Sequence, residues 1–262
     1  MTLEKKYERL KNYLCELGKV AVAFSGGVDS TFLLKVAHEV LGDKVLALTA
    51  ASVFVPQSEL DAAKNFCAEN KIHQKIFPAE VLKIEGVKEN PANRCYRCKR
   101  ALFENFLRLA EDKILVEGSN VDDLSDYRPG MKALAELDVK SPLRTADLNK
   151  SEIRTLSRIL NLPTADKPSM ACLASRFEYG EILTAQKLSQ VETAEEFLHG
   201  KGFYQLRIRV HGKIARIEIL TNDFEKILAI REEISARLKN LGFDYVTLDL
   251  QGYRTGSMNI GV

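Results

Sequence analysis

The first half of the chain alternates short apolar runs with longer amphipathic segments. The apolar runs are rich in Val, Ile and Leu and predict strands at 20–24, 45–49, 72–77 and 114–118. Apolar residues at helical spacing predict helices between them, near 31–41, 58–70 and 99–110. Strands that alternate with helices are typical of an α/β fold. We therefore expect a Rossmann-like parallel sheet with helices on both faces.

The pattern changes after residue 180. It predicts a helix, a hairpin, a second helix and a last strand, at 184–198, 204–220, 222–241 and 243–250. These elements are enough for a small α+β domain. We therefore predict two domains, a larger α/β domain at 1–180 and an α+β domain at 181–262.

The junction between the first strand and the first helix carries the sequence Ser25-Gly26-Gly27-Val28-Asp29-Ser30. Glycines let a backbone approach an anion closely, and the amide groups and dipole at a helix N-terminus favour negative charge. The junction therefore predicts a phosphate-binding loop, with an ordinary glycine turn as the alternative. A Walker A loop is excluded, because its Gly-Lys-Ser/Thr ending and its spacer are absent.

Polar residues also follow two other strands of the predicted sheet. Thr49 ends the second strand, and Gly118-Ser119-Asn120-Val121-Asp122-Asp123 follows the fourth. Ligands of parallel sheets bind beyond the carboxyl ends of the strands. We therefore expect Thr49 and Asn120 to join a nucleotide site, while a plain Asx-rich turn is the alternative for 118–123.

The composition argues against a membrane protein and against a large nucleic-acid interface. The 262 residues are 45% hydrophobic, and no apolar segment approaches the roughly 20 residues of a membrane helix. The chain starts with a charged amphipathic segment, unlike a secretory signal, so we expect a cytoplasmic protein without a membrane partner. With 38 basic and 36 acidic residues the net charge is +2, which does not favour a large nucleic-acid interface.

The five cysteines fall into two groups. Cys67 lies on an apolar helical face and Cys15 follows Leu14 in the first helix, so both are interpreted as small buried hydrophobes. Cys95 and Cys98 form a Cys-x-x-Cys unit in a loop rich in Asn, Pro and Arg, and Cys172 lies in a second loop. An odd number of cysteines argues against a disulfide framework and favours metal binding or thiol chemistry.

Two arginines stand out in the second domain. Arg207 and Arg209 are two residues apart on a predicted strand, so they project from one face, and Glu218 on the paired strand can face them. Two interpretations stay open. The arginines form either a solvated charged edge or a fork for a phosphate or carboxylate.

The phosphate loop resembles the pyrophosphate-binding loop of the PP-loop ATP pyrophosphatases, and the whole chain resembles the LarE-type sulfur transferases of that superfamily. Beside the loop, the resemblance rests on residues 93–99, 117–120, 167–176, 206–212 and 252–259. It implies an ATP- and Mg²⁺-dependent enzyme of nickel-pincer nucleotide cofactor biosynthesis. Such an enzyme adenylates a carboxylate of pyridinium-3,5-biscarboxylic acid mononucleotide, releases AMP and pyrophosphate, and forms a thiocarboxylate.

The resemblance also implies roles for residues and domains. ATP would be held by Ser25, Gly26, Gly27, Asp29, Ser30, Thr49 and Asn120. The substrate phosphate would be held by Arg176, Arg207 and Arg209, and Glu218 would help to bind a divalent ion. The domain at 181–262 would serve substrate binding or oligomerisation, and the assembly would be a homo-oligomer, a hexamer in the resembled family.

The source of the sulfur divides the resembled family. In one version the counterpart of Cys172 gives up its own sulfur, and in another three cysteines hold an iron-sulfur cluster. Cys95, Cys98 and Cys172 would then bind a [4Fe-4S] cluster with one open iron, and sulfide or a sulfur carrier would be the donor. Structural zinc with a fourth ligand is the alternative. A tRNA thiolase, an amide-forming enzyme and a non-catalytic nucleotide-binding module stay open as other functions.

Overall fold

The computed structural model describes residues 1–124, 129–168, 171–254 and 257–258. Parts of two motifs from the sequence, residues 169–170 and residues 255–256 and 259, lie outside this description. The chain divides into two compact units. The first unit comprises Met1–Glu80 and Cys95–Met170, and the second comprises Val81–Arg94 and Ala171–Val262.

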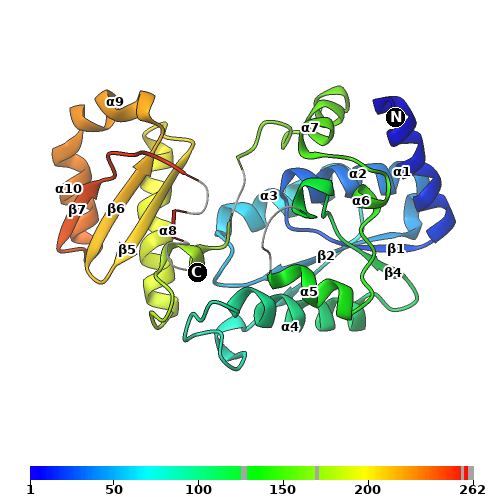
Figure 1. Ribbon diagram of the computed structural model, residues 1–262, viewed down its shortest axis with the longest axis horizontal. Helices are drawn as coiled ribbons and strands as arrows, with labels where there is room; N and C mark the ends of the chain where they lie inside the picture. The colour runs from blue at the N-terminus through cyan, green and yellow to red at the C-terminus, as the bar shows by residue number, and fades with distance from the viewer. Residues whose placement is uncertain (125–128, 169–170, 255–256, 259–262) are drawn as a thin grey trace. The chain divides into compact units, whose positions relative to one another are not determined.

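The first unit is built on a parallel four-stranded sheet with the strand order β3-β2-β1-β4 (Figure 1). Its strands are β1 (Val20–Ala23), β2 (Val45–Ala51), β3 (Gln74–Pro78) and β4 (Ile114–Val116). Its helices are α1 (Leu3–Leu17), α2 (Val28–Leu41), α3 (Gln57–Glu69), α4 (Arg94–Leu109), α5 (Pro129–Glu136), α6 (Pro142–Thr145) and α7 (Lys150–Ile159). Short 3-10 helices occur at Gly42–Lys44 and Val121–Leu124. The predicted α/β fold with a parallel sheet is confirmed.

Both faces of this sheet are covered, because side chains alternate along each strand. Val20 and Val22 of β1 pack in one apolar cluster with buried residues of α1, α2, α3 and α7. Ala21 points to the other face and packs with Phe103 and Phe106 of α4. The strands of this sheet are therefore held between two apolar layers.

The second unit is a three-stranded sheet with the order β5-β6-β7 and helices beside it. The strands are β5 (Leu206–His211), β6 (Ile214–Ile219) and β7 (Tyr245–Leu248), and the helices are α8 (Ala185–Gly200), α9 (Phe224–Ala229) and α10 (Arg231–Asn240). Short 3-10 helices are η2 (Val81–Lys83), η4 (Leu173–Arg176) and η5 (Thr221–Asp223). The predicted hairpin is the antiparallel pair β5 and β6, whereas β7 runs parallel to β6. The single helix expected at 222–241 is divided at Ile230, where the backbone leaves helical geometry (φ −115°, ψ 21°).

The two units do not coincide with the ranges 1–180 and 181–262, because residues 81–94 and 171–180 belong to the second unit. The Asn90 side-chain amide donates to the Glu178 carbonyl at 2.6 Å, and the Leu183 amide donates to the Lys88 carbonyl at 2.7 Å. This segment is far from its partners in sequence. The roles expected for the two domains stay predictions.

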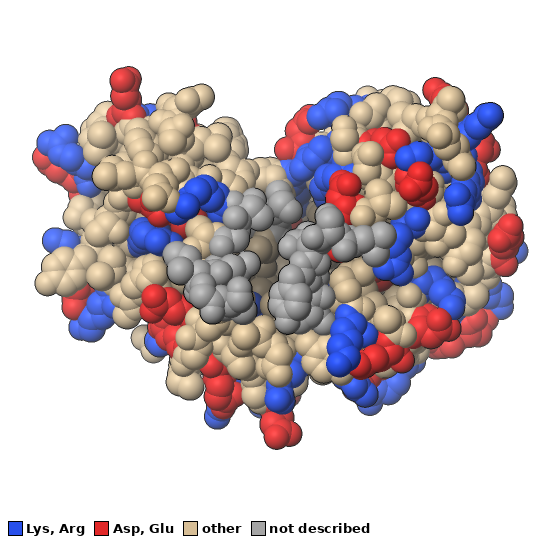
Figure 2. Space-filling view, viewed as in Figure 1, with Lys and Arg blue, Asp and Glu red and all other residues tan. Residues whose placement is uncertain are grey.

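No helix in the described part of the chain is long and apolar enough to span a membrane. On the face drawn in Figure 2, basic and acidic side chains are interspersed over the described residues. The expected lack of a nucleic-acid partner stays a prediction.

Candidate active site

The phosphate loop lies between β1 and α2, as the sequence predicts. Gly26 has φ +72°, a backbone conformation that favours glycine, although a Cβ atom there would only make ordinary contact with Ala63 at 3.4 Å. The Ser30 hydroxyl accepts from the Ser25 amide at 3.3 Å and donates to the Gly27 carbonyl at 3.2 Å. Gly27 caps α2 without a side-chain hydrogen bond. The loop is thus held in shape from within, at a helix end suited to an anion.

The loop after β4 packs directly on the start of α2. A Cβ atom on Gly118 would lie 3.0 Å from the Ser30 amide nitrogen, so glycine allows this approach. Asn120 is buried, and its Nδ2 donates to Oδ1 of Asp29 at 3.5 Å. Its Oδ1 accepts from the Asp122 amide at 2.9 Å. The structure therefore brings together Asp29 and Asn120, two residues predicted to bind ATP.

Thr49 is buried at the end of β2 and is engaged with other strands. Its hydroxyl donates to the Phe24 carbonyl at 2.9 Å and accepts from Nε2 of Gln74 at 2.9 Å. These bonds tie the carboxyl end of β2 to its two neighbours. The contacts that the structure gives Thr49 are therefore contacts within the fold, and its role toward ATP stays a prediction.

Sequence reasoning missed two lysines at the phosphate loop. Lys150, the first residue of α7, pairs with Asp29, and Lys167 donates to the Gly26 carbonyl at 3.2 Å and pairs with Glu59. Both side chains are only partly buried, with relative exposures of 31% and 20%. In the sequence Lys150 is visible only as the start of a helix, since it follows the N-cap Asn149. The packing of α7 against α2 brings it to the loop.

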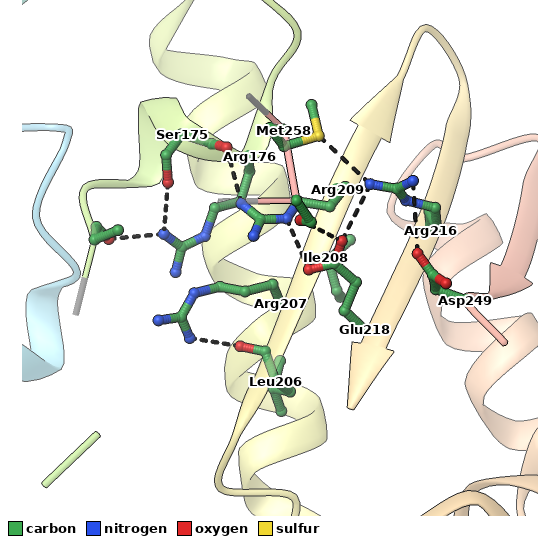
Figure 3. A network of polar contacts seen from close by, with 12 residues as sticks. Ser175, Arg176, Leu206, Arg207, Ile208, Arg209, Arg216, Glu218, Asp249 and Met258 are labelled. Carbon is green, nitrogen blue, oxygen red and sulfur yellow. Dashed lines mark hydrogen bonds and ion pairs between the residues drawn. The ribbon is translucent and has the colours of Figure 1, made fainter. Parts of the chain in front are cut away.

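The second unit contains an arginine cluster, which we define as Arg176, Arg207, Arg209 and Arg216 with Glu195 and Glu218. All of them are buried except Arg216, whose side chain is 23% exposed. Figure 3 shows three of the guanidinium groups, those of Arg176, Arg207 and Arg209, on one side of the hairpin. Arg207 lies opposite Glu218 in the β5–β6 register, and Nε of Arg209 donates to Glu218 at 3.0 Å. Arg207 is 3% exposed and Arg209 is 5% exposed. The interpretation as a solvated charged edge is therefore wrong.

Burial affects the ionisation of these arginines. Desolvation, together with the charge of Arg176, lowers the pKa of Arg207, and the Arg207 guanidinium lies 5.3 Å from the centre of the Tyr253 ring. Desolvation also lowers the pKa of Arg209, although Glu218 acts in the opposite direction. Arginine keeps its charge at neutral pH despite such shifts. The cluster thus gathers positive charge in a desolvated place that suits an anion.

Arg176 is fully buried and contacts protein groups on every side. It donates from Nε and Nη2 to Glu195 at 3.0 and 2.9 Å. Its Nη1 donates to the carbonyls of Ala171 and Cys172 at 2.7 and 3.1 Å. Arg176 therefore links α8 to the loop that carries Cys172.

Glu218 is fully buried among donors and cations. It accepts from Arg209, from Nη2 of Arg216 at 3.1 Å and from the Ser257 hydroxyl at 2.6 Å. A carboxylate in these surroundings is already neutralised, which does not favour a metal ion. Among the described residues, no three His, Cys, Asp or Glu side chains form a group that could hold a metal. The divalent ion at Glu218 stays a prediction.

Cys95 and Cys98 are on a helix and not in the loop expected from the sequence. They occupy the start of α4, where Cys95 is exposed and Cys98 is half-buried, and their spacing puts both on one helical face. The helix begins at Arg94, since its amide closes a turn on the Pro91 carbonyl at 2.9 Å. Cys172 is half-buried in the second unit, directly before η4.

The two remaining cysteines behave differently from each other. Cys67 is 2% exposed, and desolvation raises the pKa of its thiol to about 12, so the predicted buried role is confirmed. Cys15 is exposed, so the same expectation for Cys15 is wrong. Its neighbour Leu14 faces the core, and the next residue of a helix points about 100° away.

The chain is similar in sequence to several known proteins. The NAD synthase family model matches residues 2–94. An uncharacterized protein of Synechocystis is 39% identical over 262 residues, which cover 98% of each chain. The pyridinium-3,5-bisthiocarboxylic acid mononucleotide synthase of Lactiplantibacillus plantarum is 36% identical over 262 residues, 98% of this chain and 95% of that enzyme. A glutamine-hydrolyzing GMP synthase from Thermoplasma acidophilum is 28% identical, in one of its subunits, over 222 residues, 77% of this chain and 70% of that protein.

The parallel sheet, the phosphate loop and the NAD synthase match define a nucleotide-binding fold of the PP-loop type. The similarity to the L. plantarum synthase extends over almost all of both chains. The chain therefore belongs to the LarE family of ATP-dependent sulfur transferases.

Proposed function

We propose that this enzyme adenylates a carboxylate of pyridinium-3,5-biscarboxylic acid mononucleotide and then replaces AMP with sulfur to form a thiocarboxylate. The full-length similarity to the L. plantarum synthase carries this proposal. The phosphate loop supports it, because a loop without the P-loop lysine suits release of pyrophosphate rather than transfer of the γ-phosphate. A carboxylate itself resists substitution, whereas an acyl adenylate expels AMP.

The first unit supplies the groups for adenylation. The amides at the start of α2 would bind phosphate oxygens of ATP, and Ser25 and Ser30 would add hydroxyl groups. Lys150 and Lys167, both at the loop, would neutralise the departing pyrophosphate where its charge develops. Asp29 and Asn120 offer the oxygen ligands that Mg²⁺ prefers, so this donor set suits an ion that enters with ATP.

The arginine cluster would take the phosphate of the pyridinium mononucleotide. Arg207 and Arg209 project from one face of β5, and their planar guanidinium groups suit a phosphate. Arg176 would lie beside them, and its hydrogen bond to the Cys172 carbonyl would connect this phosphate site to the loop of Cys172. The assembly of several copies and the donor of the sulfur, sulfide or a carrier protein, are also part of this proposal.

We infer that Cys95, Cys98 and Cys172 together bind a [4Fe-4S] cluster. Two of the thiols share a face of α4. The third lies 3.9 Å from the guanidinium of Arg94, the residue that directly precedes Cys95 in the chain. Three thiolates suit a cubane with one open iron, which could carry a sulfide. The runner-up is a reaction in which Cys172 gives up its own sulfur, and a tRNA thiolase is the more distant alternative.

The experiment is an anaerobic reaction with ATP, Mg²⁺ and the biscarboxylic acid mononucleotide. We expect AMP, pyrophosphate and a product that carries one sulfur in place of one oxygen. ADP and orthophosphate would contradict the proposal. Iron, sulfide and zinc analysis of the anaerobic protein, with the mass of the Cys172 peptide after turnover, distinguishes the sulfur sources. Stoichiometric zinc without iron, or sulfur lost from Cys172, contradicts the cluster.

A further inference from the structure

Helix α7 carries a row of basic side chains on one face. Lys150, Arg154 and Arg158 are four residues apart, so they follow one another along the same side of the helix. Lys150 pairs with Asp29 of the phosphate loop. Arg158 pairs with Asp166, which follows the helix in the chain. The proposed reaction gives Arg154, the middle member of the row, no role.

The Arg154 side chain binds the segment that follows α7. Its Nη1 donates to the Ala165 carbonyl at 2.5 Å, and its Nη2 donates to the Lys167 carbonyl at 2.8 Å. One planar guanidinium thus holds two backbone carbonyls that are two residues apart, which suits the fork geometry of arginine. Hydrogen bonds from a charged donor are among the stronger ones in proteins. Arg154 therefore fixes the backbone from which the Lys167 side chain starts.

The Lys167 side chain extends from this backbone to the phosphate loop. Its ammonium group donates to the Gly26 carbonyl at 3.2 Å and pairs with Glu59. The four-carbon stem of a lysine is flexible, so its ammonium group has a defined place only when both ends of the side chain are held. Gly26 and Glu59 hold the ammonium end. Arg154 holds the backbone end.

Helix α7 is a firm base for these contacts. Its first turn contains a capping box between Asn149 and Glu152. Lys6 of α1 donates to the Asp147 carbonyl at 2.6 Å and to Glu152 at 3.1 Å, and Lys6 is only 9% exposed. The apolar face of α7 packs in the same core cluster as α1 and α2. The helix that carries Arg154 is therefore fixed by both polar and apolar contacts.

We propose that Arg154 is a positioning residue that sets the place of the Lys167 ammonium group at the phosphate loop. This inference rests on the proposed adenylation, in which Lys167 neutralises the departing pyrophosphate, and it adds the group that orients Lys167. Such stabilisation works best when the cation is in place before the negative charge develops. A displacement of about 1 Å can cost about 100-fold in rate. Arg154 therefore acts on pyrophosphate release through Lys167.

The first test measures pyrophosphate release with ATP, Mg²⁺ and the biscarboxylic acid mononucleotide. Arg154→Met removes both donors and keeps a long side chain. It should lower kcat by about tenfold and change KM for ATP by less than about twofold, because Lys167 acts on charge that develops during release. Arg154→Lys should lower kcat by about threefold, since the charge is kept and the fork is lost. A wild-type kcat in Arg154→Met overturns the proposal.

A double-mutant cycle determines whether Arg154 acts through Lys167. Lys167→Ala alone should lower kcat by roughly 30-fold, because the cation itself is lost. In the Lys167→Ala background, Arg154→Met should lower kcat by less than about twofold more, since the side chain that it positions is gone. A general weakening of the fold would multiply the two losses, and that result overturns the proposal. If Arg154→Met fails to fold, Arg154→Lys replaces it in the cycle, and multiplied losses or an unchanged kcat there overturn the proposal.

A matched control is Arg158→Met, one turn further along α7. Arg158 bonds the Asp166 carboxylate at 2.7 Å, but this pair is exposed, with relative side-chain exposures of 55% and 75%. The variant should therefore leave kcat and both KM values unchanged. A loss as large as that of Arg154→Met would show that any contact with residues 165–167 has the same effect. The specific role of Arg154 would then be overturned.

The second test uses inorganic pyrophosphate with Mg²⁺ and does not depend on turnover. Isothermal titration calorimetry should show that Arg154→Met and Lys167→Ala each raise the Kd for pyrophosphate by about tenfold, the size expected for a hydrogen bond to a charged group. The double variant should bind as Lys167→Ala does. A wild-type protein that binds no pyrophosphate, or an Arg154→Met variant that binds it as the wild type does, overturns the proposal. If the wild-type enzyme forms no thiocarboxylate, the proposed function fails, while the pyrophosphate affinities still decide the link between Arg154 and Lys167.

Discussion

The phosphate loop and the arginine cluster gather positive charge by different means. The loop uses backbone amides, a helix end and the partly exposed Lys150 and Lys167. The cluster uses guanidinium groups of which three, those of Arg176, Arg207 and Arg209, are almost wholly removed from water, and Glu195 and Glu218 balance their charge. Charge in the loop can therefore change without loss of the fold. Charge in the cluster is part of the core of the second unit.

The largest expected effect is on stability, in the cluster. Arg176→Ala would leave Glu195 buried without its ion-pair partner, and breaking such a pair costs about 3–5 kcal/mol. Urea unfolding followed by a signal from the second unit measures this loss. Arg231→Ala, which removes an exposed ion pair with Glu232, is the control and should change stability little. A loss from Arg176→Ala as small as that of the control would contradict the contrast between the two regions.

The next effect is on catalysis, in the loop. Lys150→Ala should lower the rate of pyrophosphate release by roughly 30- to 100-fold, because a charge at the departing pyrophosphate is lost. The free energy of unfolding should fall by less than about 1 kcal/mol, since the ion pair with Asp29 is partly exposed. Steady-state kinetics and urea unfolding check the two parts. Lys64→Ala, on the surface of α3, is the control and should affect neither.

A smaller effect is expected on KM, and it should differ between the pyridinium mononucleotide and ATP. Arg207→Lys should raise KM for the pyridinium mononucleotide by about tenfold, because one charge remains but the planar fork is lost. KM for ATP should stay unchanged, since Arg207 belongs to the second unit and the phosphate loop to the first. Initial rates with each substrate varied in turn measure both constants. Equal losses for both substrates would mean that the units do not divide the ligands in this way.

The same contrast explains what the sequence could predict. The phosphate loop is six consecutive residues at a strand–helix junction, so period and composition are enough to find it. Asn120 was found because parallel strands end at one edge of a sheet. Lys150 and Lys167 were missed, because they reach the loop only through the fold, Lys150 by the packing of α7 and Lys167 over a separation of 141 positions from Gly26.

The second unit was less predictable for a physical reason. Alternation correctly placed Arg207 and Arg209 on one face with Glu218, yet it cannot tell a buried face of charges from a solvated one. Arg94 was part of a cysteine motif without a role of its own. Arg94 is 78 positions away from Cys172 in the sequence. The two residues are in contact because residues 81–94 fold with the second unit. No local pattern carries such information.

The smallest expected effect is on the pH dependence of the free energy of unfolding. Cys67 packs in the apolar cluster with Ala63, the residue that Gly26 of the loop approaches, and desolvation raises the pKa of its thiol from 9.0 to about 12. The folded protein therefore keeps this proton between about pH 9 and pH 12, while the unfolded chain releases it. Stability from this group is complete below pH 9 and is lost as the pH rises, by about 1.4 kcal/mol at pH 10.

The measurement compares wild type with Cys67→Ala by urea unfolding at pH 8 and pH 10. Other groups also titrate here, so only the difference between the two proteins counts, and the wild type should lose about 1.4 kcal/mol more than the variant. Cys15→Ala is the matched control, because Cys15 is exposed and its change should leave the pH dependence as it was. Equal losses in wild type and Cys67→Ala would show that water reaches the thiol, and that the core beneath the phosphate loop is less dry than its packing indicates.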